Sequence, residues 1–326
     1  MSNKEKILRY LELGTGKIFS GGFLAQELGI SRTAVWKNIQ TLIHDGYPVI
    51  SVPNKGYYLD EKKDILSKNI ISSMLNTKFI GKQLEIYKSV ESTNDLLKDL
   101  AREGAVEGTV VIGDEQTKGK GRRGRSFHSP MGKGVYMSIL LRPEMDPESA
   151  LKITVIAAVA ESLAIEELFD IKAEIKWVND IFIKGRKVSG ILTEASMEME
   201  SGKLEYVVVG IGVNVAGTKE ALPEDVAKTA GFITEFADKD RSRNEVAALI
   251  LNKFEELYMH WEFKDVLEIY RKRSFLTGKE VTVIKNGEER RAKALDIDDR
   301  GNLNVEYDSG ARETLSSGEV SVRKNM

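Results

Sequence analysis

The chain has 326 residues, of which 41% are hydrophobic and 30% charged, and its formal net charge is −2 at pH 7. This length predicts two or three domains at about 100–200 residues each, and the composition excludes a disordered or collagen-like chain. The absence of cysteine excludes disulfides, a thiolate nucleophile and cysteine zinc sites. We find no signal core and no membrane-spanning stretch, and therefore expect a soluble, cytoplasmic protein without membrane contact.

The hydrophobic period changes twice along the chain, which predicts an α+β protein of three domains: 1–64, 65–271 and 272–326. The first domain is expected to contain three short helices and then a hairpin around Pro53 to Gly56, which is the order of a winged helix-turn-helix. Ser31 is a good N-cap for the third helix. The apolar residues that set the helical period are Ile7, Leu8, Leu11, Leu13, Phe23, Leu24, Leu28, Val35, Ile39, Leu42 and Ile43.

The third helix has an outward face that suits DNA. Burial of its apolar residues would leave five polar or aromatic side chains exposed, which are Arg32, Thr33, Trp36, Lys37 and Gln40. Arginine and glutamine can read base edges, and lysine can meet phosphate. Residues 1–60 have seven basic and five acidic residues, which is only a slight excess. We interpret this domain as a DNA reader; the alternative is a helical interaction module whose polar face is merely solvated.

The middle segment mixes strands with longer helices. Strands are predicted at 84–90, 109–113, 135–141, 174–177, 181–183, 188–193 and 206–215, and helices at 94–102, 151–169 and 243–261. A hairpin between Ile183 and Val188 favours a mixed sheet over a regular parallel one. From 272 onwards the strands shorten, with turns at 286–287, 300–301 and 309–310, which predicts a small β barrel.

Residues 116–125 form a basic, glycine-rich loop. Its cations are Lys118, Lys120, Arg122, Arg123 and Arg125, and it contains no acid. Such like charges repel, so we expect the loop to be mobile until an anion compensates it, and its glycines at 119, 121 and 124 would let backbone N–H groups approach that anion. The match to G-x-G-x-x-G is weak, because no helix is predicted directly after it. The alternative is a solvated loop or an RNA-binding patch.

Three further groups are candidates for the same site. Asn179 and Asp180 follow a predicted strand, where Asp180 is a candidate Mg²⁺ ligand or orienter, and Lys187 lies on the next hairpin. Ser92 to Asn94 precede a helix and are interpreted first as an N-cap and second as a polar clamp for a neutral ligand head. Taken singly, these residues are also compatible with an ordinary turn and a surface lysine.

Motifs along almost the whole chain resemble the biotin protein ligase family, of the bifunctional type that also acts as the biotin operon repressor. They are SRTAVWKNI with KGYYL, ESTND at 91–95, GKGRRGR at 119–125, KWVNDIFIKGRKVSGILTE at 176–194, GIGVN at 210–214 and GEVSVR at 318–323. The resemblance implies a winged helix, a ligase domain and an SH3-like β barrel. It also implies formation of biotinyl-5'-AMP from biotin and ATP with Mg²⁺, and transfer of biotin to a lysine of biotin carboxyl carrier protein.

Residue by residue, the resemblance implies catalytic roles for Arg122, Lys187 and Asp180. It places the ureido head of biotin or neighbouring polar atoms at Ser92, Thr93, Asn94 and Gln116, and the binding loop at Gly119, Lys120, Gly121, Arg122 and Arg123. Lys187 would meet the biotin carboxylate or the α-phosphate, Asn179 and Asp180 the nucleotide, and Asn214 the adenylate. Glu319 and Arg323 would close the C-terminal domain on the ligase domain.

The chain departs from the family pattern at Lys120, which is usually arginine, at Phe127, where tryptophan is common, and at Val178, where proline is common. No side chain identifies itself as a general base or as a Mg²⁺ ligand set. If the adenylate orders the basic loop, the loop surface is expected to form a homodimer that presents two winged helices to operator DNA. A rival hypothesis is a winged-helix transcription regulator that senses a metabolite without chemistry, and a lipoate ligase relative is another.

Overall fold

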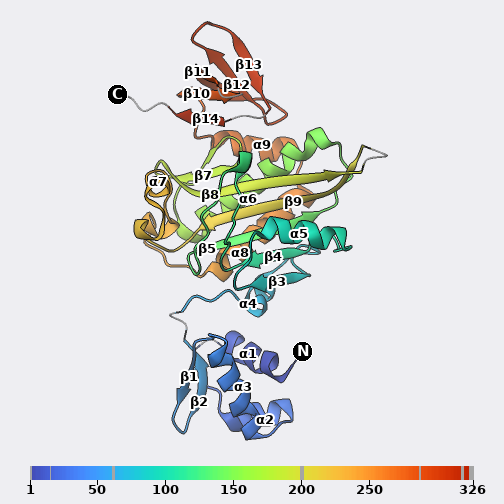
Figure 1. The fold of residues 1–326 in the computed structure, drawn as a ribbon, viewed down its shortest axis with the longest axis vertical. Coiled ribbons are helices and arrows are strands. Elements are labelled where there is room, and N and C mark those ends of the chain that lie inside the picture. Colours follow the sequence, from blue (N-terminus) through green and yellow to red (C-terminus); the bar gives the residue numbers. More distant parts are fainter. Residues whose placement is uncertain are drawn as a thin grey trace. The chain divides into compact units, whose positions relative to one another are not determined.

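The computed structural model describes residues 2–14, 16–60, 63–198, 202–285, 288–316 and 319–322. By its internal contacts the chain divides into two compact units, Met1–Met74 with Ser242–Glu245, and Leu75–Arg241 with Val246–Met326. Figure 1 shows the elements of each unit in chain order. None of the described helices is long and apolar enough to cross a membrane.

The first unit contains a helix-turn-helix followed by a hairpin. Its elements are α1 (Asn3–Leu13), α2 (Gly21–Leu28), α3 (Arg32–His44), β1 (Val49–Val52), β2 (Gly56–Leu59) and α4 (Lys68–Met74). Serine caps the first three helices, at Ser2, Ser20 and Ser31, by accepting a backbone N–H of the first turn. Gly29, at φ 63°, ends α2 in the left-handed conformation that the turn requires. The predicted winged helix-turn-helix is therefore confirmed.

Its core comes from one apolar stripe on each helix. The fully buried side chains include Ile7 and Leu11 of α1, Leu24 of α2 and Val35 and Ile39 of α3. These residues are among those whose spacing predicts the helices, since positions three or four apart share one face. Leu13, Phe23 and Ile43, which the same pattern included, are exposed instead. The opposite face of α3 remains available to solvent.

The second unit is built on a seven-stranded sheet of order β3-β4-β5-β9-β8-β7-β6. The strands are β3 (Leu84–Tyr87), β4 (Val110–Gly113), β5 (Gly134–Leu141), β6 (Glu174–Lys176), β7 (Asp180–Ile183), β8 (Arg186–Met197) and β9 (Leu204–Asn214). β3 and β4 are parallel, and the other neighbours are antiparallel. The predicted mixed sheet is confirmed.

Helices cover both faces of this sheet. α5 (Thr93–Arg102) packs on β4, β5 and β9, whereas α6 (Ala150–Phe169) packs on the strands from β6 to β9 and on α9 (Phe263–Lys272). α7 (Glu224–Ala227) and α8 (Arg243–His260) complete the helices, with short 3-10 turns at Arg122–Gly124, Pro147–Ser149, Lys219–Ala221 and Ile233–Glu235. The sequence did not predict α4, α7 or α9, although α9 buries one face at Val266, Leu267 and Tyr270.

The C-terminal part is a five-stranded antiparallel sheet of order β13-β12-β11-β10-β14. Its strands are β10 (Glu280–Lys285), β11 (Glu288–Ile297), β12 (Leu303–Tyr307), β13 (Arg312–Leu315) and β14 (Glu319–Val322), which confirms a small β domain. The expected turns at 300–301 and 309–310 join described strands, and the turn at 286–287 lies outside the described residues. Within the second unit, the Trp177 indole donates to the Gly301 carbonyl at 3.0 Å.

Candidate functional site

Two adjoining cavities lie on the side of the seven-stranded sheet that faces α5. The larger, here called the loop cavity, has a volume of about 150 Å³ and is lined by residues 120–123 and 125–127, by β7 and β8 and by Val320. The smaller, here called the inner cavity, has a volume of about 20 Å³ and is lined by the start of α5 and by β9. Four residues line both: Lys120, Phe127, Gly190 and Leu192. The two cavities therefore adjoin one another and are treated as one site.

Most of the residues predicted from the sequence meet at this site. Ser92, Thr93, Asn94 and Gln116 line the inner cavity, Lys120 lines both, and Gly121, Arg122, Arg123, Asn179, Asp180 and Lys187 line the loop cavity. Gly119 and Asn214 line neither cavity. Asn214 is buried in β9 and donates to the Gly231 carbonyl at 3.2 Å.

Neutral polar groups form one end of the inner cavity. The Thr93 backbone N–H and hydroxyl both donate to Gln116 Oε1, at 2.9 and 3.1 Å, and the Gln116 amide donates to the Ser129 hydroxyl at 2.9 Å. The Ser138 hydroxyl lies 2.8 Å from that of Thr93. Because these groups satisfy one another without a net charge, the cavity suits the polar head of a neutral ligand.

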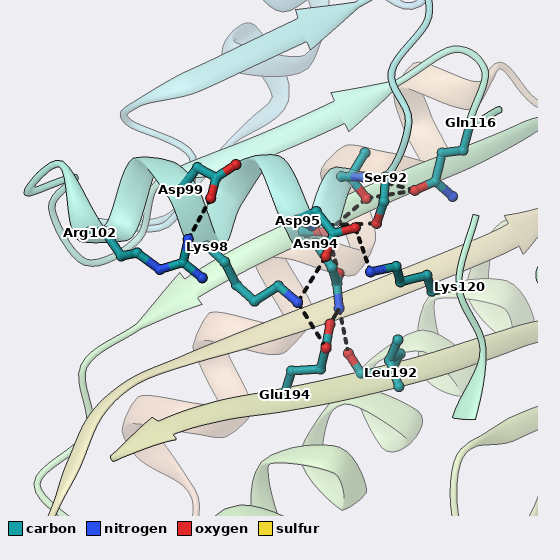
Figure 2. A network of polar contacts seen from close by, with 12 residues as sticks. Ser92, Asn94, Asp95, Lys98, Asp99, Arg102, Gln116, Lys120, Leu192 and Glu194 are labelled. Atoms are coloured by element: carbon teal, nitrogen blue, oxygen red, sulfur yellow. Dashed lines mark hydrogen bonds and ion pairs between the residues drawn. The ribbon is translucent and has the colours of Figure 1, made fainter. Parts of the chain in front are cut away.

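Asn94 is fixed from the strand side by a residue that the sequence reasoning missed. Its Nδ2 donates to Glu194 Oε2 at 2.8 Å and to the Leu192 carbonyl at 3.2 Å, as Figure 2 shows. Its Oδ1 lies 2.6 Å from the Ser138 hydroxyl. A Cβ at Gly210 would lie 2.2 Å from this Oδ1, so the strand must lack a side chain there. Glu194 is the last residue of the motif at 176–194, but its contact with Asn94 depends on the packing of α5 against the sheet, which the sequence does not show.

Cations and one carboxylate dominate the loop cavity. The Arg122 guanidinium donates to Asn179 Oδ1 at 3.2 Å, and the Lys187 ammonium pairs with Asp180 Oδ1 at 2.7 Å. Arg123 adopts φ 56° and reaches the Ile284 carbonyl of β10 at 3.4 Å. Such a site favours anionic groups, since carboxylates and phosphates gain charge-assisted hydrogen bonds from these donors.

The basic loop is better balanced than its sequence suggests. Lys118 pairs with Glu91 at 2.8 Å, and Lys120 pairs with Asp95 at 2.6 Å. Both acids precede the loop by about 25 residues, which no count of charges within the loop can detect. The expectation that the loop charges stay uncompensated until an anion binds is therefore wrong for these two lysines, because acidic partners come from α5 and the residues before it.

Glu161 is a second residue that the sequence reasoning missed. It lies on α6 with no exposed surface, on the face of the sheet opposite the cavities. Burial raises its pKa to about 8, and the nearby charge of Asp180 adds to this rise while that of Lys187 opposes it. A carboxyl among the apolar residues of α6 is visible in the sequence, but its burial is not.

On the first unit, the five predicted side chains of α3 all lie on its exposed face: Arg32, Thr33, Trp36, Lys37 and Gln40. Trp36 is 52% exposed, which is unusual for a tryptophan unless a partner covers it. Glu319 and Arg323 are predicted to close the C-terminal domain on the ligase domain. Arg323 lies outside the described residues, and nothing is described of the Glu319 side chain.

A broader depression on the C-terminal sheet is lined by Arg290, Arg291, Arg312 and neighbouring residues. Two of these arginines already pair with acids of the same sheet, Arg290 with Glu288 and Arg312 with Glu306, both at 2.7 Å. The site above is therefore the better candidate, since it joins cations to a neutral polar cavity.

The fold and the site together define a class of protein in which a helix-turn-helix unit shares its chain with a mixed-sheet domain that has a partly neutral, partly cationic site. Family models agree with this division: "HTH domain" matches residues 3–58, "Biotin/lipoate A/B protein ligase family" residues 86–214 and "Biotin protein ligase C terminal domain" residues 276–323.

Individual relatives extend the similarity to almost the whole chain. The chain is 35% identical to the bifunctional ligase/repressor BirA of Bacillus subtilis (strain 168), over 96% of this chain and 97% of that protein. It is 30% identical to the bifunctional ligase/repressor BirA of Escherichia coli (strain K12), over 95% of each. The solved biotin protein ligase from Aquifex aeolicus, in complex with biotin and ATP, is similar to 75% of this chain and 100% of its own, with TM-score 0.64 and 29% identity. The chain belongs to the family of bifunctional biotin ligase/repressors.

Proposed function

We propose that this protein is an ATP-dependent biotin protein ligase and a biotin-responsive repressor. The ligase forms biotinyl-5'-AMP and transfers biotin to a lysine of a biotin carboxyl carrier protein. The observation that supports this best is the junction of the two cavities, because a neutral polar cavity next to a cationic one matches the ureido head and the carboxylate of biotin. Membership of the ligase/repressor family supports the same assignment.

Each group of residues then has a role. Ser92, Thr93, Asn94 and Gln116 would hold the ureido head, with Gly119, Lys120, Gly121, Arg122 and Arg123 as the binding loop. The biotin carboxylate oxygen attacks the α-phosphorus of ATP, the bond to the β-phosphate bridging oxygen breaks, and pyrophosphate leaves. Two anions approach in this step, so Arg122 and Lys187 would offset their repulsion, and Asn179 and Asp180 would orient the nucleotide. In the second step, the carrier lysine amine attacks the acyl carbon, AMP leaves and the nitrogen loses its proton.

Mg²⁺ would arrive on the phosphates of ATP and supply charge neutralisation there. Among the described residues, no group of three or more histidine, aspartate or glutamate residues could hold a metal. Asp180, whose carboxylate lines the loop cavity, fits the usual mode in which Mg²⁺ keeps waters and binds one or two carboxylates beside substrate phosphates. We therefore propose Asp180 as its protein ligand or orienter.

The same chain would act on operator DNA through α3, with Arg32, Thr33, Trp36, Lys37 and Gln40 facing the major groove. We further propose a homodimer promoted by biotinyl-5'-AMP, a cytoplasmic location, and domain limits at 1–64, 65–271 and 272–326. Asn214 would support the adenylate side from within β9. The matched helix-turn-helix model and the exposed face of α3 support the DNA-binding role.

The test is incubation with biotin, Mg-ATP and a carrier domain, read out by pyrophosphate release and by avidin blot. We expect both signals to require biotin and ATP. Binding of biotin without pyrophosphate release would instead support a regulator that senses a metabolite and performs no chemistry. Activity with lipoate in place of biotin would point to a lipoate ligase.

A further inference from the structure

The two cavities are too small, as they stand, for the ligand that they match. Ligand pockets measure about 300–1,000 Å³, whereas the loop cavity has about 150 Å³ and the inner cavity about 20 Å³. One biotin molecule, under the function proposed above, must occupy both cavities at once, because its head and its carboxylate are joined by an alkyl chain. The junction between the cavities must therefore open when biotin binds.

The residues at the junction of the two cavities come from the sheet and from the loop. Of the four residues that line both cavities, Gly190 and Leu192 belong to β8, which is hydrogen-bonded on both sides to β7 and β9. Lys120 and Phe127 belong to the loop between β4 and β5. The backbone of β8 cannot move without loss of the sheet, so we expect the loop residues to move when the junction opens. Lys120 is the more exposed of the two, so it can move at the lower cost.

An ion pair fixes Lys120 in its present place. Its Nζ lies 2.6 Å from Asp95 Oδ2, in the first turn of α5, and Figure 2 shows the ammonium pointing at that carboxylate. Asp95 also pairs with Lys98 at 2.9 Å, and Lys98 pairs with Glu194 at 2.9 Å. Partial burial raises the pKa of Asp95, but hydrogen bonds from Lys120 and Lys98 outweigh it and hold that pKa below its ordinary value. Asp95 thus remains an anion at neutral pH.

The other end of this row of alternating charges contacts Asn94, which lines the inner cavity. Glu194, the last member of the row, accepts the hydrogen bond from Asn94. Asp95 therefore lies between Asn94, which is proposed to hold the ureido head, and Lys120, which lines both cavities (Figure 2). Lys98 keeps Glu194 as a partner when the Asp95 charge is removed, so the two halves of the row can be separated experimentally.

We propose that Asp95 is a positioning residue that holds Lys120 at this junction, so that biotin enters only after the Lys120–Asp95 pair breaks. The vitamin's carboxylate, or later the phosphate of the adenylate, then replaces Asp95 as the partner of Lys120. Only molecules in which the Lys120–Asp95 pair is broken can bind biotin. The apparent affinity for biotin is therefore the intrinsic affinity multiplied by the fraction of such molecules. Because Lys120 and Asp95 are 48% and 37% exposed at their side chains, the pair contributes modestly, and its loss is expected to change rates about two- to fivefold.

The experiment is stopped-flow binding of biotin to the full chain, followed by tryptophan fluorescence, to which Trp177 in the loop cavity contributes. Asp95→Asn is expected to raise the association rate constant about two- to fivefold and to leave the dissociation rate constant unchanged. A merely structural role of Asp95 would instead slow association or speed dissociation. The same measurement with biotin methyl ester, which has no carboxylate, must show the same acceleration.

The matched control is Glu91→Gln, which removes one negative charge from the other ion pair of this loop, Lys118–Glu91. Neither of these residues lines a cavity, so the binding rates are expected to be those of the wild type. An equal acceleration in Glu91→Gln, or an acceleration of biotin but not of its methyl ester, would show general attraction of the anion and would overturn the proposal.

Lys120→Gln breaks the same pair from its other side and keeps the proposal testable if Asp95→Asn does not fold. With the methyl ester, it is expected to accelerate association as much as Asp95→Asn, and the double variant is expected to add nothing further. Additive effects would contradict the role of the pair. If the wild type binds biotin as fast as Asp95→Asn, the role of the Lys120–Asp95 pair is overturned and the proposed function is not. If the wild type does not bind biotin at all, the proposed function is overturned as well.

Discussion

Arg122 shows how one side chain can serve both retention and specificity. It lines the loop cavity, donates to Asn179, and is one of several cations there that can meet the phosphate of an adenylate. A hydrogen bond to a charged group contributes about 1.5–3 kcal/mol, so its removal should speed the escape of an anionic intermediate. Under the proposed function, the site would retain the mixed anhydride only while such donors and the loop exclude water.

We predict that Arg122→Gly raises the rate of biotinyl-5'-AMP dissociation about 10- to 100-fold, since each 1.4 kcal/mol corresponds to a factor of ten. Escaped adenylate should then biotinylate lysines of bystander proteins, which avidin blots of a mixture of carrier and albumin would detect. Lys118→Gly, in the same loop but outside both cavities, is the control. Unchanged retention and strict use of the carrier in Arg122→Gly would refute the role.

Glu161 makes the stability of the protein depend on pH in an unusual direction. Its folded pKa of about 8 lies above the ordinary value of 4.5, because it is fully buried. Between these values the folded state binds more protons than the unfolded state, so the free energy of unfolding falls as pH rises, by up to about 1.4 kcal/mol per unit. The stabilising contribution is complete below pH 4.5 and is lost towards pH 8.

We predict that Glu161→Gln, which cannot ionise, reduces the fall in stability between pH 5 and pH 8. Urea denaturation at a series of pH values measures the free energy of unfolding directly. Glu256→Gln, which alters an exposed carboxyl of α8, should leave the slope as in the wild type. The assignment fails if Glu161→Gln and the wild type have equal slopes.

At the scale of elements, β9 lines the inner cavity with two glycines, which have no side chains. Gly210 and Gly212 face the cavity in a strand that is otherwise buried and apolar. A Cβ on Gly212 would lie 2.6 Å from the Phe127 ring, and one on Gly210 would lie 2.2 Å from Asn94 Oδ1. The strand therefore allows both α5 and the basic loop to approach it closely.

Gly210→Ala is predicted to raise the KM for biotin about tenfold or more, because Asn94 must leave its place between Ser138 and Glu194. The KM for ATP should change much less, since the loop cavity does not include Gly210. Steady-state pyrophosphate release measures both constants. Ser196→Ala, at the far end of β8, is the control, and a proportional rise of both KM values would indicate general damage rather than loss of the head-group site.

At the scale of the whole molecule, the proposed repressor function requires two DNA-reading units. A winged helix that reads one half-site gains affinity when a symmetric partner reads the other. We infer that the basic loop, once ordered by the adenylate, forms the surface that pairs, and that carrier protein competes for it. One chain could then switch between ligation and repression according to demand for biotin.

Sedimentation velocity with and without biotinyl-5'-AMP tests this coupling. We predict a shift towards dimer in the presence of the adenylate, and a return to monomer when carrier protein is added in excess. The Arg122→Gly variant should need a higher adenylate concentration for the same shift. A monomer at all protein concentrations in the presence of saturating adenylate would remove the mechanism.

The sequence by itself predicted most of the elements and most of the residues that line the two cavities. Amphipathic periods predicted α1 to α3, with Ser31 as the cap of α3, and strand patterns predicted the mixed sheet, because these signals depend on neighbours within a few residues. The basic loop, KWVND and the lysine that follows could be assigned to one site because their motifs resemble those of a known family. α4 and α7 have seven and four residues, which gives too little local signal. α9 is amphipathic over its ten residues, so its pattern could have been found in the sequence and was missed.

Only the tertiary structure decided which charges meet and which are buried. The pairing of Lys120 with Asp95, and of Asn94 with Glu194, joins residues 25 and 100 positions apart through the packing of α5 on the sheet. The burial of Glu161 likewise depends on the face of α6 that meets the strands. Electrostatic energies follow distance and solvent exposure, and neither can be obtained from the order of residues along the chain.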